Sequence, residues 1–246
     1  MRAILFLTVS LFALFAFNAA LTAADASLNS LTKAEANDGW RLLFDGKSLD
    51  QWRGYKKETL PDGWKVQDDG SFCRTGGGDI VTKEQFDSFD LMIEWKISPG
   101  GNSGIFYRAT EAHGAIYESA PEMQVLDNTK HGDGKNPKTS AGANYALIPP
   151  PKDVTKPAGE WNQARLLVDG QRVEHWLNGE KLLEYTLGSP EWTELVKGSK
   201  FAGWSDYGKA LKGHLGLQDH GDQVWYRNVK IRTPADVAEA KKKAKK

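Results

Sequence analysis

The stretch WNQARLLVDGQRVEHWLNGEKLLEYTL, from Trp161 to Leu187, predicts three consecutive β-strands. Its short strand-like runs are separated by Asp169-Gly170 and by Asn178-Gly179. Both dipeptides favour the two-residue turns of β-hairpins, because these turns need positive φ angles. An antiparallel meander is therefore expected in this part of the chain.

Segments on both sides extend the pattern of short strands and tight turns. SFDLMIEWKISPGGNSGIFYRAT (Ser88 to Thr110) predicts two strands around Pro99-Gly100-Gly101, and GHLGLQDHGDQVWYRNVKIRT (Gly213 to Thr233) predicts two more. GWRLLFDGKSLDQWRG (Gly39 to Gly54) alternates apolar and polar residues and breaks at the hairpin-type dipeptide Asp45-Gly46.

Helices are expected to be rare in this chain. Pro190 to Phe201 is the only segment that predicts one, with Trp192, Leu195 and Val196 on one side. Many short strands, few helices and Gly, Asp and Asn turns together predict an all-β fold. We expect one antiparallel β-sandwich of the jelly-roll kind.

The chain divides into four predicted segments. Residues 1–26 have the pattern of a secretory signal peptide, with Arg2, an apolar run and a cleavage site at Ala24-Asp25-Ala26 or at Thr22-Ala23-Ala24. An uncleaved anchor is the alternative, although the apolar run is short for a membrane span. Residues 27–38 are a polar lead-in, 39–233 the sandwich, and 234–246 a basic tail that we expect to be disordered. The mature protein is thus expected to be periplasmic or secreted, with no stable membrane association after cleavage.

Composition excludes several classes of function. The formal net charge is +0, which argues against a general attraction to nucleic acid or to anionic membranes. Cys73 is the only cysteine, so no intrachain disulfide is possible. The sequence contains no phosphate-binding loop, no dinucleotide fingerprint and no nucleophile elbow.

A second stretch, PEMQVLDN from Pro121 to Asn128, carries the candidate chemistry. On a strand, Glu122 and Gln124 project from one face, while Met123 and Val125 project from the other and can pack in the core. Asp127 follows at the strand end. We predict Glu122 and Asp127 as catalytic residues and Gln124 as a substrate ligand. The alternative is a half-solvated strand whose polar face meets bulk water.

Three histidines are candidates for the site. His220 is the predicted catalytic base, because it shares a strand face with Gln218 and precedes Gly221 at the strand end. His131 lies in a long irregular stretch that can cover a groove as a lid. His175 lies in the middle of a strand, where a packed or a surface histidine is the alternative. Gln218, His131 and His175 are predicted substrate-binding residues.

Tyr107 and Arg108, which are adjacent on a predicted strand, complete the set of expected substrate contacts. The Arg108 guanidinium can clamp a ketone or a hydroxyl. An ion pair with Glu94 or Glu122 on a neighbouring strand is the alternative role.

Several blocks together identify a resemblance. The blocks are NSGIFYR (102–108), EMQVLDN (122–128), GEWNQARLLVDGQRVEHWLNG (159–179) and GHLGLQDHGDQVWYRNVKIR (213–232). In this order they resemble the 3-keto-disaccharide hydrolase domain, long catalogued as a domain of unknown function. The resemblance covers Gly39 to Thr233. It implies a concanavalin A-like sandwich, similar to laminarinases and legume lectins, with a ligand groove on the concave face.

The resemblance also implies a chemistry. The family is expected to act on glycosides already oxidised at C3, by elimination across C1–C2 followed by hydration, which releases 3-keto-glucose. The resemblance therefore also implies a functional link to a sugar 3-dehydrogenase, which makes the ketone. This chemistry needs a base at C2 and an electrophile at the C3 oxygen. The electrophile can be a cation, hydrogen-bond donors or a divalent metal held by Glu122, Asp127 and His220. No metal-binding motif is present, so no cofactor is predicted from the sequence.

Two other functions compete with this one. Laminarinase-type glucanases have a carboxylate where this chain has Gln124, and an amide cannot ionise, so double displacement by two carboxyls is disfavoured. A non-catalytic, lectin-like carbohydrate-binding module would use the same groove without a base.

Overall fold

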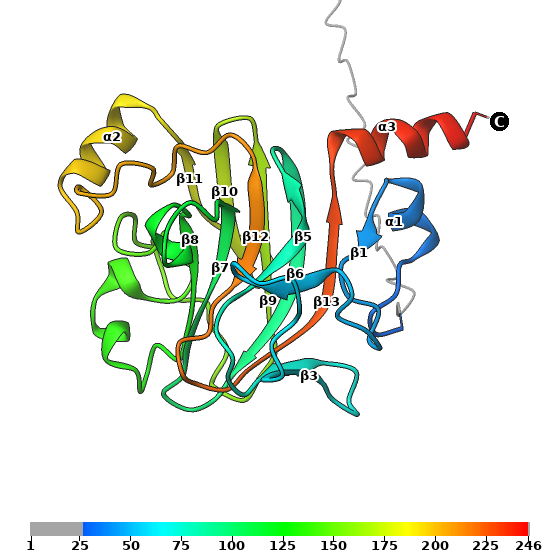
Figure 1. The fold of residues 1–246 in the computed structure, drawn as a ribbon, viewed down its shortest axis with the longest axis horizontal. Helices are drawn as coiled ribbons and strands as arrows, with labels where there is room; N and C mark the ends of the chain where they lie inside the picture. Colours follow the sequence, from blue (N-terminus) through cyan, green and yellow to red (C-terminus); the bar gives the residue numbers. More distant parts are fainter. Residues whose placement is uncertain (1–26, 246) are drawn as a thin grey trace, which may run out of the picture.

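Two antiparallel sheets packed face to face form the protein, as the computed structural model of residues 27–245 shows (Figure 1). The 8-stranded sheet contains β11 (Glu180–Thr186), β10 (Arg172–Leu177), β9 (Asn162–Asp169), β6 (Phe89–Ile97), β13 (Val224–Arg232), β4 (Phe72–Arg74) and β3 (Trp64–Val66) in this order, with β1 (Arg41–Leu42) also paired to β13. The 5-stranded sheet has the order β2 (Trp52–Gly54), β5 (Ile80–Phe86), β12 (Gly213–Leu217), β7 (Asn102–Ala109) and β8 (Glu122–Leu126). The predicted all-β sandwich is confirmed.

The meander β9–β10–β11 is confirmed as predicted. Arg172 pairs with Asp169 across the first turn, and Leu177 pairs with Glu180 across the second. Asn178 has a φ of 51°, which is the left-handed conformation that the second turn requires.

In the other predicted pairs both strands form, but the two strands of a pair are not hydrogen-bonded to each other as a hairpin. β6 and β7, and likewise β12 and β13, lie in different sheets, so their connections carry the chain from one layer to the other. The Asp45-Gly46 break separates β1 from β2, which also lie in different sheets. Alternation of side chains identifies a strand but does not identify its partner.

The core lies between the two sheets. Ile105 and Tyr107 on β7 and Met123 and Val125 on β8 face inward and are at most 1% exposed. They pack in one cluster with inward residues of the 8-stranded sheet such as Trp95. The opposite face of the 5-stranded sheet is therefore free to carry other chemistry.

Helix α2 (Pro190–Lys197) forms within the predicted segment, and two further helices were not predicted. The lead-in contains α1 (Lys33–Asn37). In place of the predicted disordered tail, α3 (Pro234–Lys243) follows β13 directly. Both helices begin with a capping box, formed by Thr32 with Glu35 and by Thr233 with Asp236. Each box pairs two backbone N–H groups, those of the N-cap residue and of the residue three positions later. The prediction missed both helices because it relied on an apolar face, which the tail lacks.

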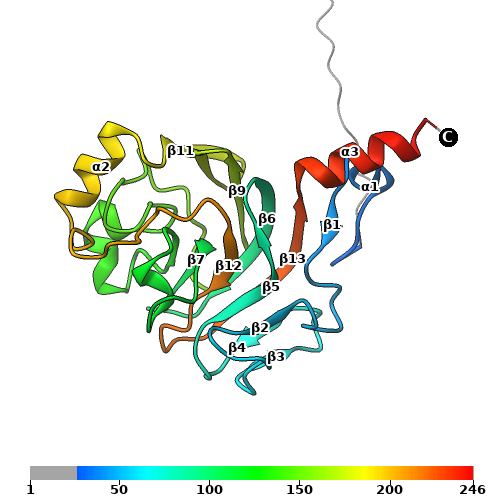
Figure 2. The same ribbon diagram turned by 45° about the horizontal axis from the view of Figure 1, so that its top comes forward.

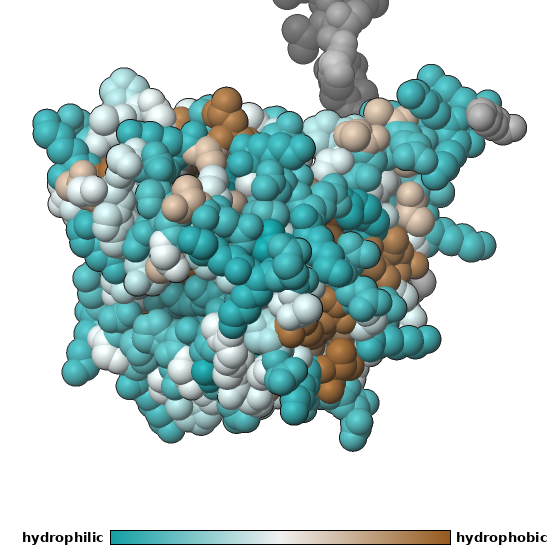
Figure 3. All heavy atoms as spheres, in the orientation of Figure 1, coloured by the Kyte–Doolittle hydropathy of each residue, from teal (hydrophilic) through white to brown (hydrophobic). Residues whose placement is uncertain are grey.

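The segments 110–121, 127–148 and 187–212 gather at the end of the molecule away from α1 and α3 (Figures 1 and 2). They contain α2 and the short helices η1 (Ile116–Glu118), η2 (Gly132–Lys135) and η3 (Pro137–Thr139). The face shown in Figure 3 is mostly hydrophilic. Among residues 27–245, no helix has the length and apolar character of a membrane span. The predicted signal peptide, 1–26, lies outside the described residues.

Candidate functional site

A cavity of about 330 Å³ lies over the outer face of the 5-stranded sheet. It is lined by Asn102, Tyr117, Ala120, Glu122, Gln124, Tyr145, Lys200, Phe201, Trp204, Tyr207, Gln218 and His220. Its volume is at the lower end of the 300–1,000 Å³ that is common for small-molecule sites, so it suits a single sugar ring.

Strands β7 and β8 build the floor of the cavity. Gln124 pairs with Gly104, and Glu122 pairs with Phe106, so all four residues belong to one face of the sheet. Met123 and Val125 point into the core, which confirms the predicted alternation along β8. Gln218 follows β12, and its backbone N–H donates to the Gly104 carbonyl at 3.0 Å, which ties the third strand to the same floor.

Gly104 makes room for the Glu122 side chain. A Cβ atom at Gly104 would lie 1.9 Å from Oε1 of Glu122, far inside van der Waals contact. Any larger residue at position 104 would therefore displace this carboxyl group. This close approach explains the glycine within a buried strand.

Glu122 is 5% exposed, and burial raises the pKa of its carboxyl group to about 8. The charge of Lys200 opposes this shift and lowers the pKa, while Asp79 and Asp133 raise it further. The carboxyl group thus holds its proton at neutral pH and releases it just above, a range suited to a group that exchanges protons with a substrate.

Four polar atoms of the lining are buried and have no hydrogen-bond partner within the described part of the protein. They are Asn102 Oδ1, Gln124 Oε1, Gln218 Oε1 and the Tyr207 hydroxyl oxygen. A buried polar atom without a partner costs about 1–3 kcal/mol. Gathered in one cavity, these atoms suit a ligand that is rich in hydroxyl groups, because each can bond to one.

Lys200 brings a positive charge to the cavity from the segment after α2. Its Nζ lies 4.2 Å from the ring centroid of Tyr145 and 5.4 Å from that of Phe201. Partial burial lowers the pKa of this amine, whereas the charges of Glu122 and Asp133 raise it. The charge of Lys200 therefore favours the ionised form of the Glu122 carboxyl group.

His220 and His131 lie together at the rim. Their ring centroids are 6.0 Å apart in an edge-to-face arrangement, and His220 is exposed. The backbone N–H of Asp133 donates to His131 Nδ1 at 3.1 Å, which fixes this ring at the start of η2. Of the predicted site residues, Glu122, Gln124, Gln218 and His220 line the cavity, and His131 lies beside it.

Asp127 and Arg108 have structural positions instead of the predicted places in the site. Asp127 accepts hydrogen bonds from the backbone N–H groups of Gly100 and Thr129, at 2.7 and 3.0 Å, and so holds two turns together. Arg108 donates to the carbonyls of Asp87 and Gly170 at the far end of β7. Both side chains bond to backbone in loops whose proximity is set by the tertiary fold, which strand alternation does not reveal.

Tyr107 and His175 also lie away from the cavity, in the core between the sheets. His175 Nδ1 donates to the Gly142 carbonyl at 3.1 Å, and Nε2 accepts from the Tyr185 hydroxyl at 2.9 Å. The Tyr107 hydroxyl bonds to that of Tyr185. Both predicted substrate contacts are thus members of a buried polar chain, and the alternative of a packed core histidine holds for His175.

The position of His175 predicts a pH-dependent stability. Burial lowers the pKa of His175 to about 4, and an unfolded histidine titrates near 6.5. Between these values the unfolded chain binds a proton that the folded chain refuses. The free energy of unfolding should therefore fall with decreasing pH in this window, by up to about 1.4 kcal/mol per pH unit.

Chemical denaturation of wild type and His175→Phe at pH 7, 6 and 5 measures this effect as a difference between two slopes. The comparison with the variant is needed because Asp79 and Glu122 also titrate. Their pKa values are raised to about 6 and about 8, so their protonation makes the free energy of unfolding rise as the pH falls. The same pH dependence of stability in both proteins would contradict the lowered pKa of His175.

The residues described include no group of three or more His, Cys, Asp or Glu side chains arranged to hold a metal ion. The ligand set considered from the sequence is not assembled, because Asp127 bonds to the turns at Gly100 and Thr129 and does not line the cavity.

Lys200 and the aromatic residues of segment 187–212 are the parts of the site that the sequence did not predict. Lys200 and Phe201 end the predicted helix but lie beyond α2, Trp204 and Tyr207 follow them, and none of the four has strand periodicity. Four large or charged side chains within eight residues of an irregular segment were the available signal, since such loops often carry function.

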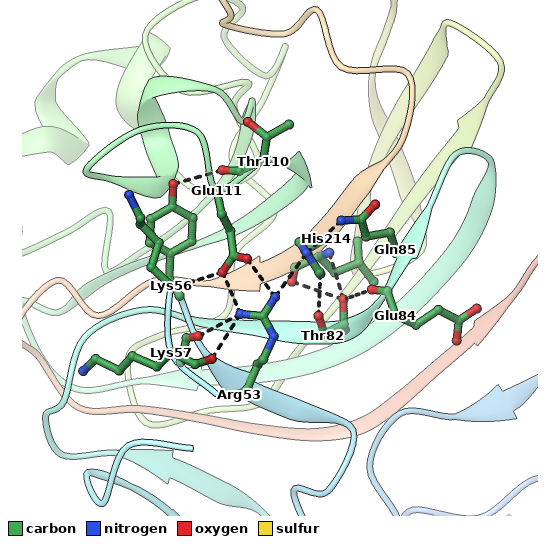
Figure 4. Close-up of polar contacts among 12 residues, drawn as sticks. Arg53, Lys56, Lys57, Thr82, Glu84, Gln85, Thr110, Glu111 and His214 are labelled. Carbon is green, nitrogen blue, oxygen red and sulfur yellow. Dashed lines mark hydrogen bonds and ion pairs between the residues drawn. The ribbon is translucent and has the colours of Figure 1, made fainter. Parts of the chain in front are cut away.

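A second polar cluster lies at the other end of the same sheet (Figure 4). Arg53 donates to both carboxylate oxygens of Glu111, at 2.6 and 2.9 Å. His214 Nδ1 donates to the Thr82 carbonyl at 2.6 Å, which leaves Nε2 to accept from Gln85 and Arg53. The partners within this cluster satisfy one another, and it fastens the start of segment 110–121.

Residues 39–232 match the family described as the 3-keto-alpha-glucoside-1,2-lyase-like domain. The chain is 38% identical to the 3-keto-disaccharide hydrolase of Bacteroides thetaiotaomicron over 239 residues, which is 84% of this chain and 82% of the relative.

Two solved structures from Parabacteroides distasonis are also similar. One candidate glycosyl hydrolase is 36% identical with a TM-score of 0.79, over 83% of this chain and 98% of its own. A second is 30% identical with a TM-score of 0.63, over 79% and 98%.

Proposed function

The chain belongs to the 3-keto-alpha-glucoside-1,2-lyase-like family, and we propose that it cleaves 3-keto-glycosides by elimination and rehydration, with release of 3-keto-glucose. The observation that carries this proposal is a single buried carboxyl group that faces a cation. In the part of the chain that the structure describes, Glu122 is the only acidic residue lining the cavity, and Lys200 is the only cationic amine.

This arrangement does not support displacement at the anomeric carbon. A retaining glycosidase needs two carboxyl groups about 5–5.5 Å apart, and an inverting one needs two that are further separated. Here the side chain beside Glu122 on the floor is the amide of Gln124, and Asp127 bonds to neighbouring turns. A base paired with an electrophile is instead what proton abstraction next to a ketone requires.

In the proposed elimination, the Glu122 carboxylate takes the proton from C2 of the sugar. Lys200 stabilises the negative charge that develops on the C3 oxygen. The C2 electron pair then forms the C1–C2 double bond and expels the oxygen on C1. A water molecule held by His220 at the rim gives its proton to this leaving oxygen and becomes hydroxide.

Hydration completes the reaction. The hydroxide adds to C1 of the unsaturated ketone. The carboxyl group of Glu122 returns a proton to C2. Glu122 thereby recovers its starting protonation, so the net reaction consumes one water and needs no oxidant or reductant.

Incubation with a 3-keto-glucoside and with its parent glucoside tests the proposal. Release of sugar from the keto form alone is the expected result. Release from both compounds would favour a conventional glucanase, and binding without release would favour a lectin-like module. Either outcome would overturn the proposed function.

Gly104→Ala should reduce activity without removing any catalytic group. The added methyl group pushes the Glu122 carboxyl from its position, and displacement of a base by about 1 Å costs on the order of 100-fold in rate. Gly114→Ala is the matched control, because its Cβ meets open space. Equal kcat/KM for Gly104→Ala and wild type would show that this position of Glu122 is not the reactive one.

The expected setting of the reaction follows from the same chemistry. A 3-keto-glycoside must be supplied by an enzyme that oxidises a sugar at C3, so we propose a functional link to a sugar 3-dehydrogenase. The signal-like pattern of residues 1–26 supports action in the periplasm or outside the cell.

A further inference from the structure

Two aromatic side chains stand at the mouth of the cavity. Tyr117 is 44% exposed, and its ring centroid is 5.5 Å from that of Trp204, with 31° between the ring planes. Trp204 packs in turn on Phe201, at 5.1 Å. Tyr117 is exposed and Trp204 is half-buried, and together they continue the cavity wall as an apolar surface available to a ligand.

The two segments that carry this pair are fastened to each other. His113 Nε2 donates to Asp206 Oδ2 at 2.7 Å, and the Gly208 backbone N–H donates to the Ser119 carbonyl at 2.9 Å. The pair of rings is therefore held in place before any ligand arrives, which lowers the entropy that binding must overcome.

The root of segment 110–121 is anchored as well. The bidentate Arg53–Glu111 ion pair holds it, and the Tyr55 hydroxyl lies 2.9 Å from the Thr110 carbonyl (Figure 4). Segment 110–121, which carries Tyr117, is thus held at its start by Arg53 and Tyr55 and further along by its contacts with segment 187–212.

Polarity divides the cavity into two parts. The floor carries Glu122 and the unpartnered amide oxygens, which suit the hydroxyl-rich ring that reacts. The mouth offers Tyr117 and Trp204. When the reactive ring lies on the floor, the group on C1 has room to extend toward the mouth, because the sheet closes the opposite side.

We propose that Tyr117 and Trp204 form the subsite for the leaving group, and that they select a ring-shaped leaving group over a small alkyl group. The C–H face of a second pyranose ring stacks on such aromatic surfaces. This inference rests on the proposed function, and it adds the part of the substrate on which the enzyme discriminates.

The test compares two substrates that share the 3-keto-glucosyl ring. One is a 3-keto disaccharide and the other is methyl 3-keto-glucoside. The measured quantity is the ratio of kcat/KM for the disaccharide to kcat/KM for the methyl compound. Tyr117→Ala should lower this ratio by about fivefold to tenfold, the scale of one aromatic stacking contact.

Three further variants complete the experiment. Trp204→Ala should lower the ratio at least as much, whereas Tyr117→Phe keeps the ring and should preserve it. Leu211→Ala is the matched control, because Leu211 is an exposed apolar residue (66%) that does not line the cavity. Tyr117 is the decisive position, since its exposure makes misfolding of the variant a minor concern.

An unchanged ratio in Tyr117→Ala, with the wild type active on both substrates, would overturn the subsite and leave the proposed function standing. Failure of the wild type to cleave either substrate would overturn the proposed function and the subsite with it. A lower ratio in both alanine variants, and not in Leu211→Ala, supports the inference.

Discussion

Replacement of Glu122 by glutamine is expected to lower kcat on a 3-keto-glucoside by about 10²–10⁴-fold, which is the usual contribution of a positioned acid–base group. Glutamine has nearly the same shape as glutamate, so it fits beside Gly104 but cannot take the proton from C2. Single-turnover or steady-state release of 3-keto-glucose measures the effect.

The stability of the same variant separates chemistry from folding. Burial raises the pKa of Glu122 to about 8, so ionisation of this group costs stability as the pH rises from the ordinary glutamate value toward 8. Glu122→Gln should therefore unfold at an equal or higher temperature than wild type at pH 8. Glu180→Gln, at a surface ion pair with Lys152, is the matched control for both readouts. Wild-type turnover by a folded Glu122→Gln protein would exclude Glu122 as the base.

Replacement of Lys200 is expected to have the next largest effect. Lys200→Met removes the charge that stabilises the enolate oxygen and should lower kcat by about 10²–10³-fold, the scale found when a single oxyanion donor is lost. Lys200→Arg retains a cation and should retain more activity than Lys200→Met.

The pH profile distinguishes this role of Lys200 from a structural one. The charge of Lys200 lowers the pKa of Glu122, so removal of the charge must raise that pKa above its value of about 8. Since the base acts as a carboxylate, kcat/KM should increase with pH up to about 8 in wild type and up to a higher pH in Lys200→Met. An ascending limb at the same pH in both proteins would contradict the electrostatic pairing.

The fold was largely predictable, because its signals are local. The Asp-Gly and Asn-Gly turns fixed the meander β9–β10–β11, and alternation along EMQVL put Glu122 and Gln124 on one face of a strand. Sheet membership was not predictable in this way, since β6 and β7 look like a hairpin in sequence but belong to different layers. Pairing depends on contacts that are distant along the chain.

The site was predictable on the strands and directly after them. Glu122 and Gln124 lie on β8 as predicted, whereas β12 ends at Leu217, so Gln218 and His220 reach the same cavity from just beyond the strand on which they were predicted. Tyr107 does not line the cavity because its side chain points from β7 into the core between the sheets. The side chain of the preceding residue, Phe106, points to the opposite face. Lys200 escaped prediction because an irregular segment places it, and no periodicity indicates where such a segment folds back.

Reaction in deuterium oxide tests the central claim most directly. The account predicts that enzymatically released 3-keto-glucose carries deuterium at C2, because Glu122 takes that proton and exchanges with the water that enters for hydration. Mass spectrometry or NMR of the product measures the label, and 3-keto-glucose incubated without enzyme corrects for spontaneous exchange. Release of 3-keto-glucose with no deuterium at C2 above that blank, and at an unchanged rate when C2 of the substrate carries deuterium, would contradict elimination and point to displacement at C1.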